Sequence, residues 1–214
     1  MNNVFYPILF FVVSYLLGSF PTAYLIVKKF VGKDVREEES KNVGAMNVMR
    51  ITGNPVLFLM AIIGDAGKGA LSVLIPQYFS HLGYNVLLAV TLAGFGVILG
   101  HCFSIYFKIK DNKFYGGKAQ ASVAGVLIAL NFNLLFLPWA AIAVLFVLAT
   151  QTFFFGQFAG NILLPFIGYF FAPEYFTLCL LMAIPIFIKQ WPHFIPALRG
   201  GRPKWYWKKR DAIK

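Results

Sequence analysis

The chain of 214 residues is 59% hydrophobic and 18% aromatic, and only 13% of its residues are charged. Soluble domains carry about 25% charged residues, and here the apolar residues fall in blocks of about 18 or more, so the composition excludes an ordinary soluble domain and predicts a polytopic, all-α membrane protein. The net charge of +11 does not indicate a nucleic-acid-binding protein, because the Lys and Arg residues gather beside the apolar blocks, mainly at 28–50, 108–118 and 189–214.

The placement of these basic residues also predicts an orientation. Short basic loops beside membrane spans mark the cytoplasmic side, and a basic inner rim suits anionic lipids and anionic substrates. No charge precedes the first apolar block, whereas Lys28 and Lys29 follow it, so we expect the N-terminus outside and the C-terminus in the cytoplasm. Cys102 and Cys179 stand in apolar surroundings without the spacing of a disulfide framework or a metal site, and we expect no metal.

Three spans are predicted in the first half of the chain, over residues 4–27, 55–79 and 86–107. Gly18, Ser19 and Pro21 interrupt the first span and indicate a kink. The second span starts at a proline and carries Asp65 and Lys68, which are three residues apart and share a helix face. We expect them to form a structural ion pair that turns inward, because a charge that faces lipid at mid-span costs about 2.5–3.5 kcal/mol.

The region 119–188 contains a single charged residue, Glu174, and abuts a basic cluster at each end. An even number of crossings must therefore connect its ends, and four spans of about 17 residues each fit its length better than two. We expect its turns near residues 131–133, 156–161 and 172–174. The whole chain is then a single membrane-embedded domain, 1–214, of seven spans (five if the region holds two), with a basic and aromatic cytoplasmic tail at 199–214.

Two GxxxG patterns, Gly96 to Gly100 and Gly156 to Gly160, occur in these apolar regions. The first lies inside the third span and predicts close helix contact. The second lies at one of the expected turns.

A polar segment from Ser40 to Arg50 separates the first two spans. Asn42 and Asn47 offer amide donors, Gly44 lets a ligand approach the backbone, and the Arg50 guanidinium suits a phosphate or a carboxylate. These residues predict an anion site, with a solvated loop and a capping serine as the alternative.

A second candidate anion site is Gly116-Gly117-Lys118, which precedes an apolar helix that carries Ser122. Glycines before a helix leave free backbone N–H groups aimed at an anion, and Lys118 adds a full charge. The spacing is not that of a P-loop, because Asn112 stands where the first glycine would be. The alternative is a flexible loop that ends in a helix cap. His101, at the end of the third span, is a further candidate, although a lone histidine at a helix end is more often structural.

Together these segments resemble the bacterial integral-membrane glycerol-3-phosphate acyltransferases that use acyl phosphate. The family's first-loop pattern Ser-x-Asn-x-Gly-Ala-x-Asn-x-x-Arg is matched by Ser40, Asn42, Gly44, Ala45, Asn47 and Arg50. Its other motifs are matched by Gly18 and Ser19; by Asp65, Lys68 and Gly69; by Gly100, His101 and Phe103; and by Gly116, Gly117, Lys118, Ala121 and Ser122.

The resemblance implies seven spans in the inner (plasma) membrane and an active site that faces the cytoplasm. It implies transfer of a fatty acyl group from acyl phosphate to the 1-position of glycerol 3-phosphate, which gives lysophosphatidic acid for phospholipid synthesis, without metal, cofactor or coenzyme A. By position, Gly116, Gly117 and Lys118 would hold the donor phosphate and Arg50 the acceptor phosphate. The residues Ser40, Asn42, Asn47 and His101 would line the same site, and Gly44 and Ser122 would add substrate contacts.

The sequence departs from the family pattern in three places. A short insertion, roughly residues 111–115, precedes Gly116, and Ala119 replaces the last glycine of the Gly-Gly-Lys-Gly pattern. In the C-terminal motif Gln190 stands in place of the histidine, and we expect His193, three residues further, to take over a role in the acceptor site. Two other functions therefore stay open: acyl transfer to a different polyol phosphate, and a non-catalytic membrane protein that binds lipid or a partner.

Overall fold

The computed structural model describes residues 4–199. Over that range the chain folds into helices, and its only strand-like pairing is an isolated bridge between Ser104 and Tyr115. The α-helices are α1 (Phe5–Ser19), α2 (Thr22–Val31), α3 (Ala45–Thr52), α4 (Pro55–Tyr78), α5 (Val86–Cys102), α6 (Ile105–Asp111), α7 (Gln120–Asn131), α8 (Leu137–Thr150), α9 (Phe153–Ile162), α10 (Leu164–Phe171), α11 (Phe176–Gln190) and α12 (Phe194–Leu198). Short 3₁₀ or π turns are η1 (Ser80–Leu82), η2 (Phe132–Phe136), η3 (Pro173–Tyr175) and η4 (Trp191–His193).

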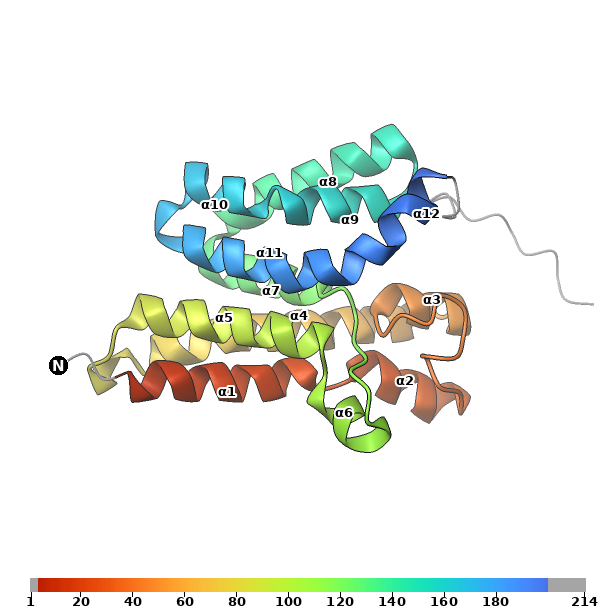
Figure 1. Ribbon diagram of the computed structural model, residues 1–214, viewed down its shortest axis with the longest axis horizontal. Helices are drawn as coiled ribbons and strands as arrows, with labels where there is room; N and C mark the ends of the chain where they lie inside the picture. The colour runs from red at the N-terminus through yellow and green to blue at the C-terminus, as the bar shows by residue number, and fades with distance from the viewer. Residues whose placement is uncertain (1–3, 200–214) are drawn as a thin grey trace, which may run out of the picture.

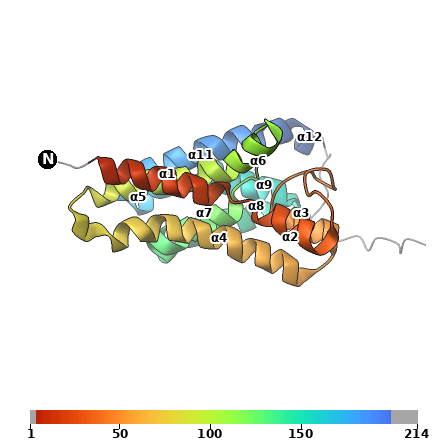
Figure 2. The same ribbon diagram turned by 90° about the horizontal axis from the view of Figure 1, so that it is seen from below.

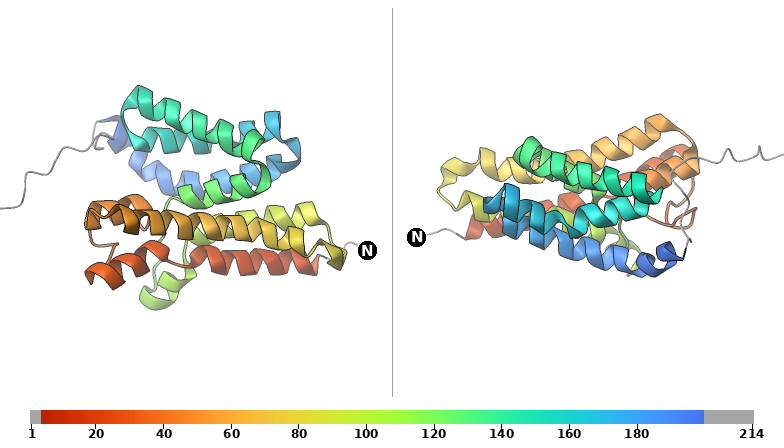
Figure 3. Two further views of the ribbon diagram at one scale, coloured as in Figure 1. Left: turned by 180° about the vertical axis from the view of Figure 1, so that it is seen from behind. Right: turned by 90° about the horizontal axis from the view of Figure 1, so that it is seen from above.

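The long helices run side by side along the longest axis of the molecule (Figures 1 and 2). Helices α1, α4 and α5 form one layer and α8, α9 and α10 form a second. Between them lie α7, against α4, and α11, against α5 (Figures 1 and 3). Helices α2, α3 and α12 gather at one end of the bundle with α6 beside them, whereas α1 begins at the opposite end (Figure 1). The segments with candidate anion-binding residues are therefore near one end.

Glycines let neighbouring helices approach each other closely. Gly96 and Gly100 of α5 face the backbone of α1, where an added methyl carbon would overlap with the carbonyl oxygens of Phe11 and Tyr15. The expected close contact at this GxxxG pattern is confirmed. Between α4 and α7 a second close contact forms without such a pattern, because Gly69 faces the carbonyl oxygen of Ser122.

We expect Gly69→Ala to lower the free energy of unfolding by about 1–3 kcal/mol, because its methyl group would push α4 away from α7. Gly67→Ala is the matched control on the same helix: no atom lies within 4 Å of a methyl carbon at that position. It should leave stability unchanged or raise it by up to about 1 kcal/mol, because alanine is the better helix former. Unfolding in detergent checks both, and equal effects would contradict this account of the contact.

The surface of the bundle is apolar along its helices. Large side chains such as Ile63, Leu145 and Phe170 are 62%, 63% and 70% exposed, which suits lipid and not water. Four helical stretches are long and apolar enough to cross a membrane: Phe5–Val31, Pro55–Tyr78, Gln120–Thr150 and Pro173–Leu198. The pair α9 and α10, bent by 45°, makes a fifth if it counts as one span, and α5 is apolar but shorter. The chain is thus an integral membrane protein. By length and composition the described residues confirm four or five spans, and the expected seven stay a prediction.

The first two predicted spans, 4–27 and 55–79, are confirmed. The kink in the first span is the break between α1 and α2, at Phe20 and Pro21. The second span begins at Pro55, where the Asn54 side chain accepts hydrogen bonds from the backbone N–H groups of Val56 and Leu57 at 2.8 and 3.4 Å.

The region 119–188 confirms two of the three expected turns. Asn131 is extended, with φ −160° and ψ 104°, and Ala172 ends α10. The turn expected at 156–161 is wrong, because α9 runs through it. The chain breaks instead at Gln151, in the left-handed region with φ 54°. Gly156 serves to bring α9 against Ala143 of α8, so this GxxxG pattern marks a helix contact.

Candidate active site

The end of α5 organises the candidate site. After α6 the chain returns to the end of α5, where the Ser104 N–H donates to the Tyr115 carbonyl at 2.9 Å. The Gly117 N–H then donates to the His101 carbonyl at 3.0 Å. These two bonds hold the segment that leads to Lys118 directly beside His101.

Packing explains why glycine stands at 116 and 117. A methyl carbon at Gly116 would overlap with the carbonyl oxygens of His101 and Cys102. At Gly117 it would overlap with His101 Nε2 on one side and with the Val43 carbonyl oxygen on the other. Gly117 is therefore the point at which the segment Ser40–Arg50, the segment Gly116–Lys118 and α5 meet.

Four polar side chains form a buried cluster behind this junction. Lys68 Nζ lies 2.8 Å from Asp65 Oδ1, which confirms the expected ion pair, and it donates to the Phe20 carbonyl at 3.1 Å, at the break between α1 and α2. His101 Nδ1 lies 3.7 Å from the same Asp65 oxygen and 3.2 Å from Ser122 Oγ. The nearby carboxylate favours the tautomer with its proton on Nδ1, which leaves Nε2, the atom beside Gly117, free to accept a hydrogen bond.

A small pocket, with a volume of about 10 Å³, lies between this cluster and the break in the first span. Its walls include Ser19, Asp65, Lys68, His101, Ser104 and Phe107. Sequence reasoning missed Ser104 and Phe107 as site residues, and it treated Ser19 only as a motif match and Asp65–Lys68 only as a structural pair. Ser104 Oγ donates to the Ser19 carbonyl at 2.6 Å, so the two serines fasten α5 to the break after α1. The interruption Gly18-Ser19-Phe20-Pro21 was the available signal.

The segment Ser40–Arg50 is held from inside by Asn47. The Asn47 side chain is fully buried, accepts from the Ser40 N–H and Oγ at 3.1 and 2.8 Å, and donates to the Val35 and Glu38 carbonyls at 3.0 and 3.2 Å. Both of its donor hydrogens are used within the protein. The expectation that Asn47 binds substrate therefore gives way to a role in shaping the loop.

The other predicted residues of this segment are more open. Asn42 and Gly44 are half-buried at the start of α3, and the Gly44 carbonyl accepts hydrogen bonds from the backbone N–H groups of Asn47 and Val48. Arg50 is half-buried in the last turn of α3, and its guanidinium forms no ion pair with any residue between 4 and 199. These groups are available to a ligand.

Lys118 precedes α7 as expected, and Ala119 caps that helix in the left-handed conformation, with φ 56°, that glycine ordinarily favours. Lys118 is half-buried with Nζ 5.2 Å from the centre of the Phe154 ring. Ser122 is fully buried one turn into α7 and contacts His101, so it supports the histidine and does not face open space.

The structure does not bring His193 to the pocket walls. The residue lies in η4, beyond the end of α11, because Pro192 stops the regular helix at Gln190. Gln190 itself is 1% exposed, and its Nε2 has no hydrogen-bond partner among residues 4–199. Of the expected tail, only Arg199 lies within the described residues.

The fold and the site define a class: an integral membrane protein with a buried Asp–Lys–His cluster under two polar loops. A family model described as glycerol-3-phosphate acyltransferase matches residues 8–200. A glycerol-3-phosphate acyltransferase of Caulobacter vibrioides is 35% identical over 195 residues, covering 89% of this chain and 84% of the relative. One of Wolbachia sp. subsp. Brugia malayi is 34% identical over 196 residues, covering 91% and 96%. This chain belongs to the glycerol-3-phosphate acyltransferase family.

A solved structure confirms the fold. The crystal structure of PlsY, an integral membrane glycerol 3-phosphate acyltransferase, in its glycerol 3-phosphate form, superposes with a TM-score of 0.79. It is 22% identical in sequence, and the match covers 94% of this chain and 96% of that one. The lysophosphatidic acid form gives a TM-score of 0.76.

Proposed function

We propose that this protein transfers a fatty acyl group from acyl phosphate to the 1-position of glycerol 3-phosphate, giving lysophosphatidic acid for phospholipid synthesis. Family membership supports the acceptor and the reaction type. The structural observation that carries the proposal is the contact of Gly117 with both His101 Nε2 and the Val43 carbonyl. The contact brings the Gly116–Lys118 segment and the Ser40–Arg50 segment together beside His101, which supports transfer between two phosphate-bearing substrates.

The reaction needs positioning more than activation. The glycerol 3-phosphate hydroxyl oxygen attacks the carbonyl carbon of the acyl phosphate, the bond from that carbon to the phosphate oxygen breaks, and the hydroxyl proton leaves with the phosphate. Because the leaving phosphate is already a good leaving group, charge stabilisation and orientation supply most of the catalysis, and the chemistry requires neither a metal ion nor a cofactor.

In the proposed site, Lys118 and the free N–H groups at the start of α7 bind the donor phosphate, next to Gly116 and Gly117. Arg50 binds the acceptor phosphate. His101 Nε2 accepts the hydrogen bond of the attacking hydroxyl, with Asp65 and Ser122 holding the ring. The remaining proposed contacts come from Ser40, Asn42 and Gly44, with Asn47 as their support.

We also propose seven crossings, with the N-terminus outside and the active site at the cytoplasmic face of the inner membrane. The extended residue Asn131 supports this topology, because α7 and α8 run in opposite directions on either side of it (Figure 3). The crossings are then α1–α2, α4, α5, α7, α8, α9–α10 and α11. The basic segments 28–50 and 108–118 lie together near one end, which suits the cytoplasmic side.

A comparison of donors tests the proposed reaction. Purified protein in detergent would receive glycerol 3-phosphate with either palmitoyl phosphate or palmitoyl coenzyme A, and lysophosphatidic acid would be followed by mass spectrometry. We expect product from palmitoyl phosphate only. Product from the coenzyme A ester would overturn the donor assignment. Phosphate release without this lipid would favour another polyol phosphate as acceptor, and no reaction by folded protein would favour a non-catalytic role.

Arg50→Ala should raise the KM for glycerol 3-phosphate by about 10–100-fold. Hydrogen bonds to a charged group contribute about 1.5–3 kcal/mol, which corresponds to a change in affinity of that size. The kcat and the KM for acyl phosphate should change little, because the proposed role of Arg50 is limited to the acceptor phosphate. Arg50→Lys keeps the charge but loses the planar guanidinium group, so its KM for glycerol 3-phosphate should lie between those of the wild type and Arg50→Ala. An unchanged KM for glycerol 3-phosphate would remove Arg50 from the proposed role.

A further inference from the structure

Arg36 lies in the loop between α2 and α3, outside every motif described above, yet most of its side chain is covered. Its guanidinium carbon is 4.6 Å from the centre of the Phe107 ring, 4.9 Å from that of Tyr115 and 5.5 Å from that of Tyr24. The Arg36 side chain is 11% exposed. The guanidinium is thus held against three aromatic rings, whose faces attract a positive charge.

Two carboxylates complete the cage. Arg36 Nε donates to Asp34 Oδ1 at 2.9 Å and Nη2 donates to Asp34 Oδ2 at 2.6 Å, so one edge of the guanidinium binds both oxygens of this carboxylate. Nη1 donates to Asp111 Oδ2 at 2.5 Å, across 75 residues of chain. The hydrogen bonds from Arg36 lower the pKa of the Asp34 carboxyl, which keeps that pair charged at neutral pH.

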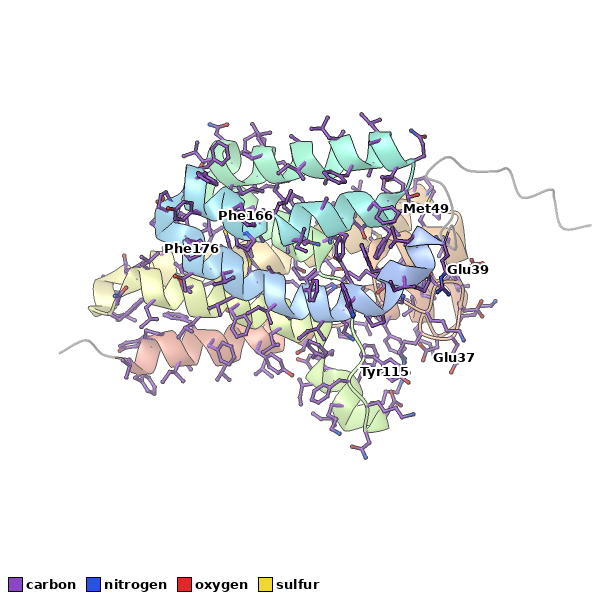
Figure 4. All side chains as sticks on the ribbon, turned by 45° about the horizontal axis from the view of Figure 1, so that its top comes forward. Glu37, Glu39, Met49, Tyr115, Phe166 and Phe176 are labelled. Carbon is purple, nitrogen blue, oxygen red and sulfur yellow. The ribbon has the colours of Figure 1, made fainter. Side chains whose placement is uncertain are left out.

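The members of this cage belong to different segments. Tyr24 is on α2, and Asp34 and Arg36 are on the loop after it. Phe107 and Asp111 are on α6, and Tyr115, which is labelled in Figure 4, is on the segment after α6. We call this set of six residues the Arg36 clasp. Asp34 lies in the same loop as Arg36, whereas Asp111 lies on α6. The ion pair of Arg36 with Asp111 therefore links this loop to α6.

Both ends of the clasp lead directly into the candidate active site. Phe107 is 2% exposed and forms part of the pocket wall, and Tyr115 precedes the glycines that lie against His101. On the other side, the carbonyl of Val35, next to Arg36, accepts from the Asn47 side chain that shapes the Ser40–Arg50 segment. A shift of the clasp would therefore move the two halves of the site relative to each other.

We propose that Arg36 is a positioning residue, which fastens α6 and the Gly116–Lys118 segment to the Ser40–Arg50 segment and so sets the separation of the two phosphate sites. The proposal rests on the acyl transfer proposed above. Without the clasp, the two segments spend less time in the arrangement that binds substrate. Apparent affinity falls in proportion to the population of the competent arrangement, whereas the rate at saturation changes less.

Asp111→Asn tests this link with the least disturbance, because it removes one charge at an exposed end of the clasp. We expect the KM for both substrates to rise by about 3–10-fold, with kcat within about twofold of the wild-type value. Arg36→Ala should raise both KM values by about 10–30-fold. Arg36→Lys should give KM values close to those of Arg36→Ala, because an ammonium group cannot pair with two carboxylates and stack on rings at once. The Arg36→Ala/Asp111→Asn double variant should be no worse than Arg36→Ala, because both changes break one link.

Glu38→Gln provides the matched control. It removes another ion pair of the same loop, Lys33 Nζ to Glu38 Oε1 at 3.0 Å, which is exposed and does not reach α6. Its KM values should stay at the wild-type level. Unchanged KM values in both Asp111→Asn and Arg36→Ala, or an equal rise in Glu38→Gln, would overturn the proposal.

Hydrogen exchange separates failure of the clasp from failure of the proposed reaction. If the wild-type protein is inactive with acyl phosphate and glycerol 3-phosphate, the proposed function fails, and the clasp is judged on backbone exchange alone. Asp111→Asn should then speed exchange at residues 112–117 and in the Ser40–Arg50 segment, and Glu38→Gln should not. Equal exchange in wild type and Asp111→Asn would show that Arg36 fastens nothing.

Discussion

Lys118→Ala should lower the rate of phosphate release from acyl phosphate by about 100-fold or more, the usual cost of removing a group that stabilises charge on a leaving oxygen. Lys118 stands directly before α7, where its charge adds to the free N–H groups and the positive end of the helix. The Lys118 ammonium group lies 5.2 Å from the centre of the Phe154 ring, whose face attracts a positive charge.

Two control variants test whether the effect depends on a positive charge at position 118. Lys118→Arg keeps the charge and should retain measurable release, whereas Lys113→Ala removes an exposed charge from the same basic segment and should leave the rate unchanged. Thermal unfolding in detergent checks that each variant is folded. Phosphate release by folded Lys118→Ala at more than about one third of the wild-type rate would show that the donor phosphate binds elsewhere, because a direct contact is worth far more.

Asp65→Leu should lower the free energy of unfolding by about 3–5 kcal/mol, because it leaves the Lys68 ammonium buried in the bundle without its carboxylate. Both side chains are at most 5% exposed, and among residues 4–199 Lys68 makes one further hydrogen bond, to the Phe20 carbonyl. Chemical unfolding in mixed detergent micelles measures the loss.

The double variant Asp65→Leu/Lys68→Met separates stability from catalysis. Removing both charges should recover most of the lost stability, since a buried ion pair is seldom more stable than an apolar pair of similar size. Activity should stay low, because Asp65 also lies beside His101 Nδ1. An active double variant would mean that the pair is structural only, and a stable Asp65→Leu would mean that Lys68 finds another partner.

Local patterns predicted the parts of this fold that depend on local chemistry. Pro55 marks a helix start and Pro21 a kink wherever they occur in a chain, because the ring fixes φ and removes a donor. Asp65 and Lys68 were expected to pair because their separation places them on one helix face.

The parts that failed depend on contacts that are distant in sequence. A glycine pair such as Gly156 and Gly160 is compatible with a turn and with close packing, and only the neighbouring α8 decides between them. Similarly, nothing around Arg36 indicates that Asp111, 75 residues later, is its partner.

In the candidate site, too, the residue types predicted the chemistry but not the direction in which each side chain points. The residue types at Ser40–Arg50 and Gly116–Lys118 indicated anion binding, because amides, glycines and basic side chains serve it directly. Their chemistry did not show that Asn47 is used up inside the loop or that Ser122 turns to His101, since both depend on which way a side chain faces.

The central claim is that one site joins the two substrates, and coupling of the two products tests it most directly. Purified protein would be given palmitoyl phosphate with increasing glycerol 3-phosphate, and released phosphate and lysophosphatidic acid would be measured in the same samples. We predict that phosphate release rises with glycerol 3-phosphate, and that each phosphate is matched by one lipid molecule acylated at the 1-position. Phosphate release that is independent of glycerol 3-phosphate, with no lipid formed, would contradict the account.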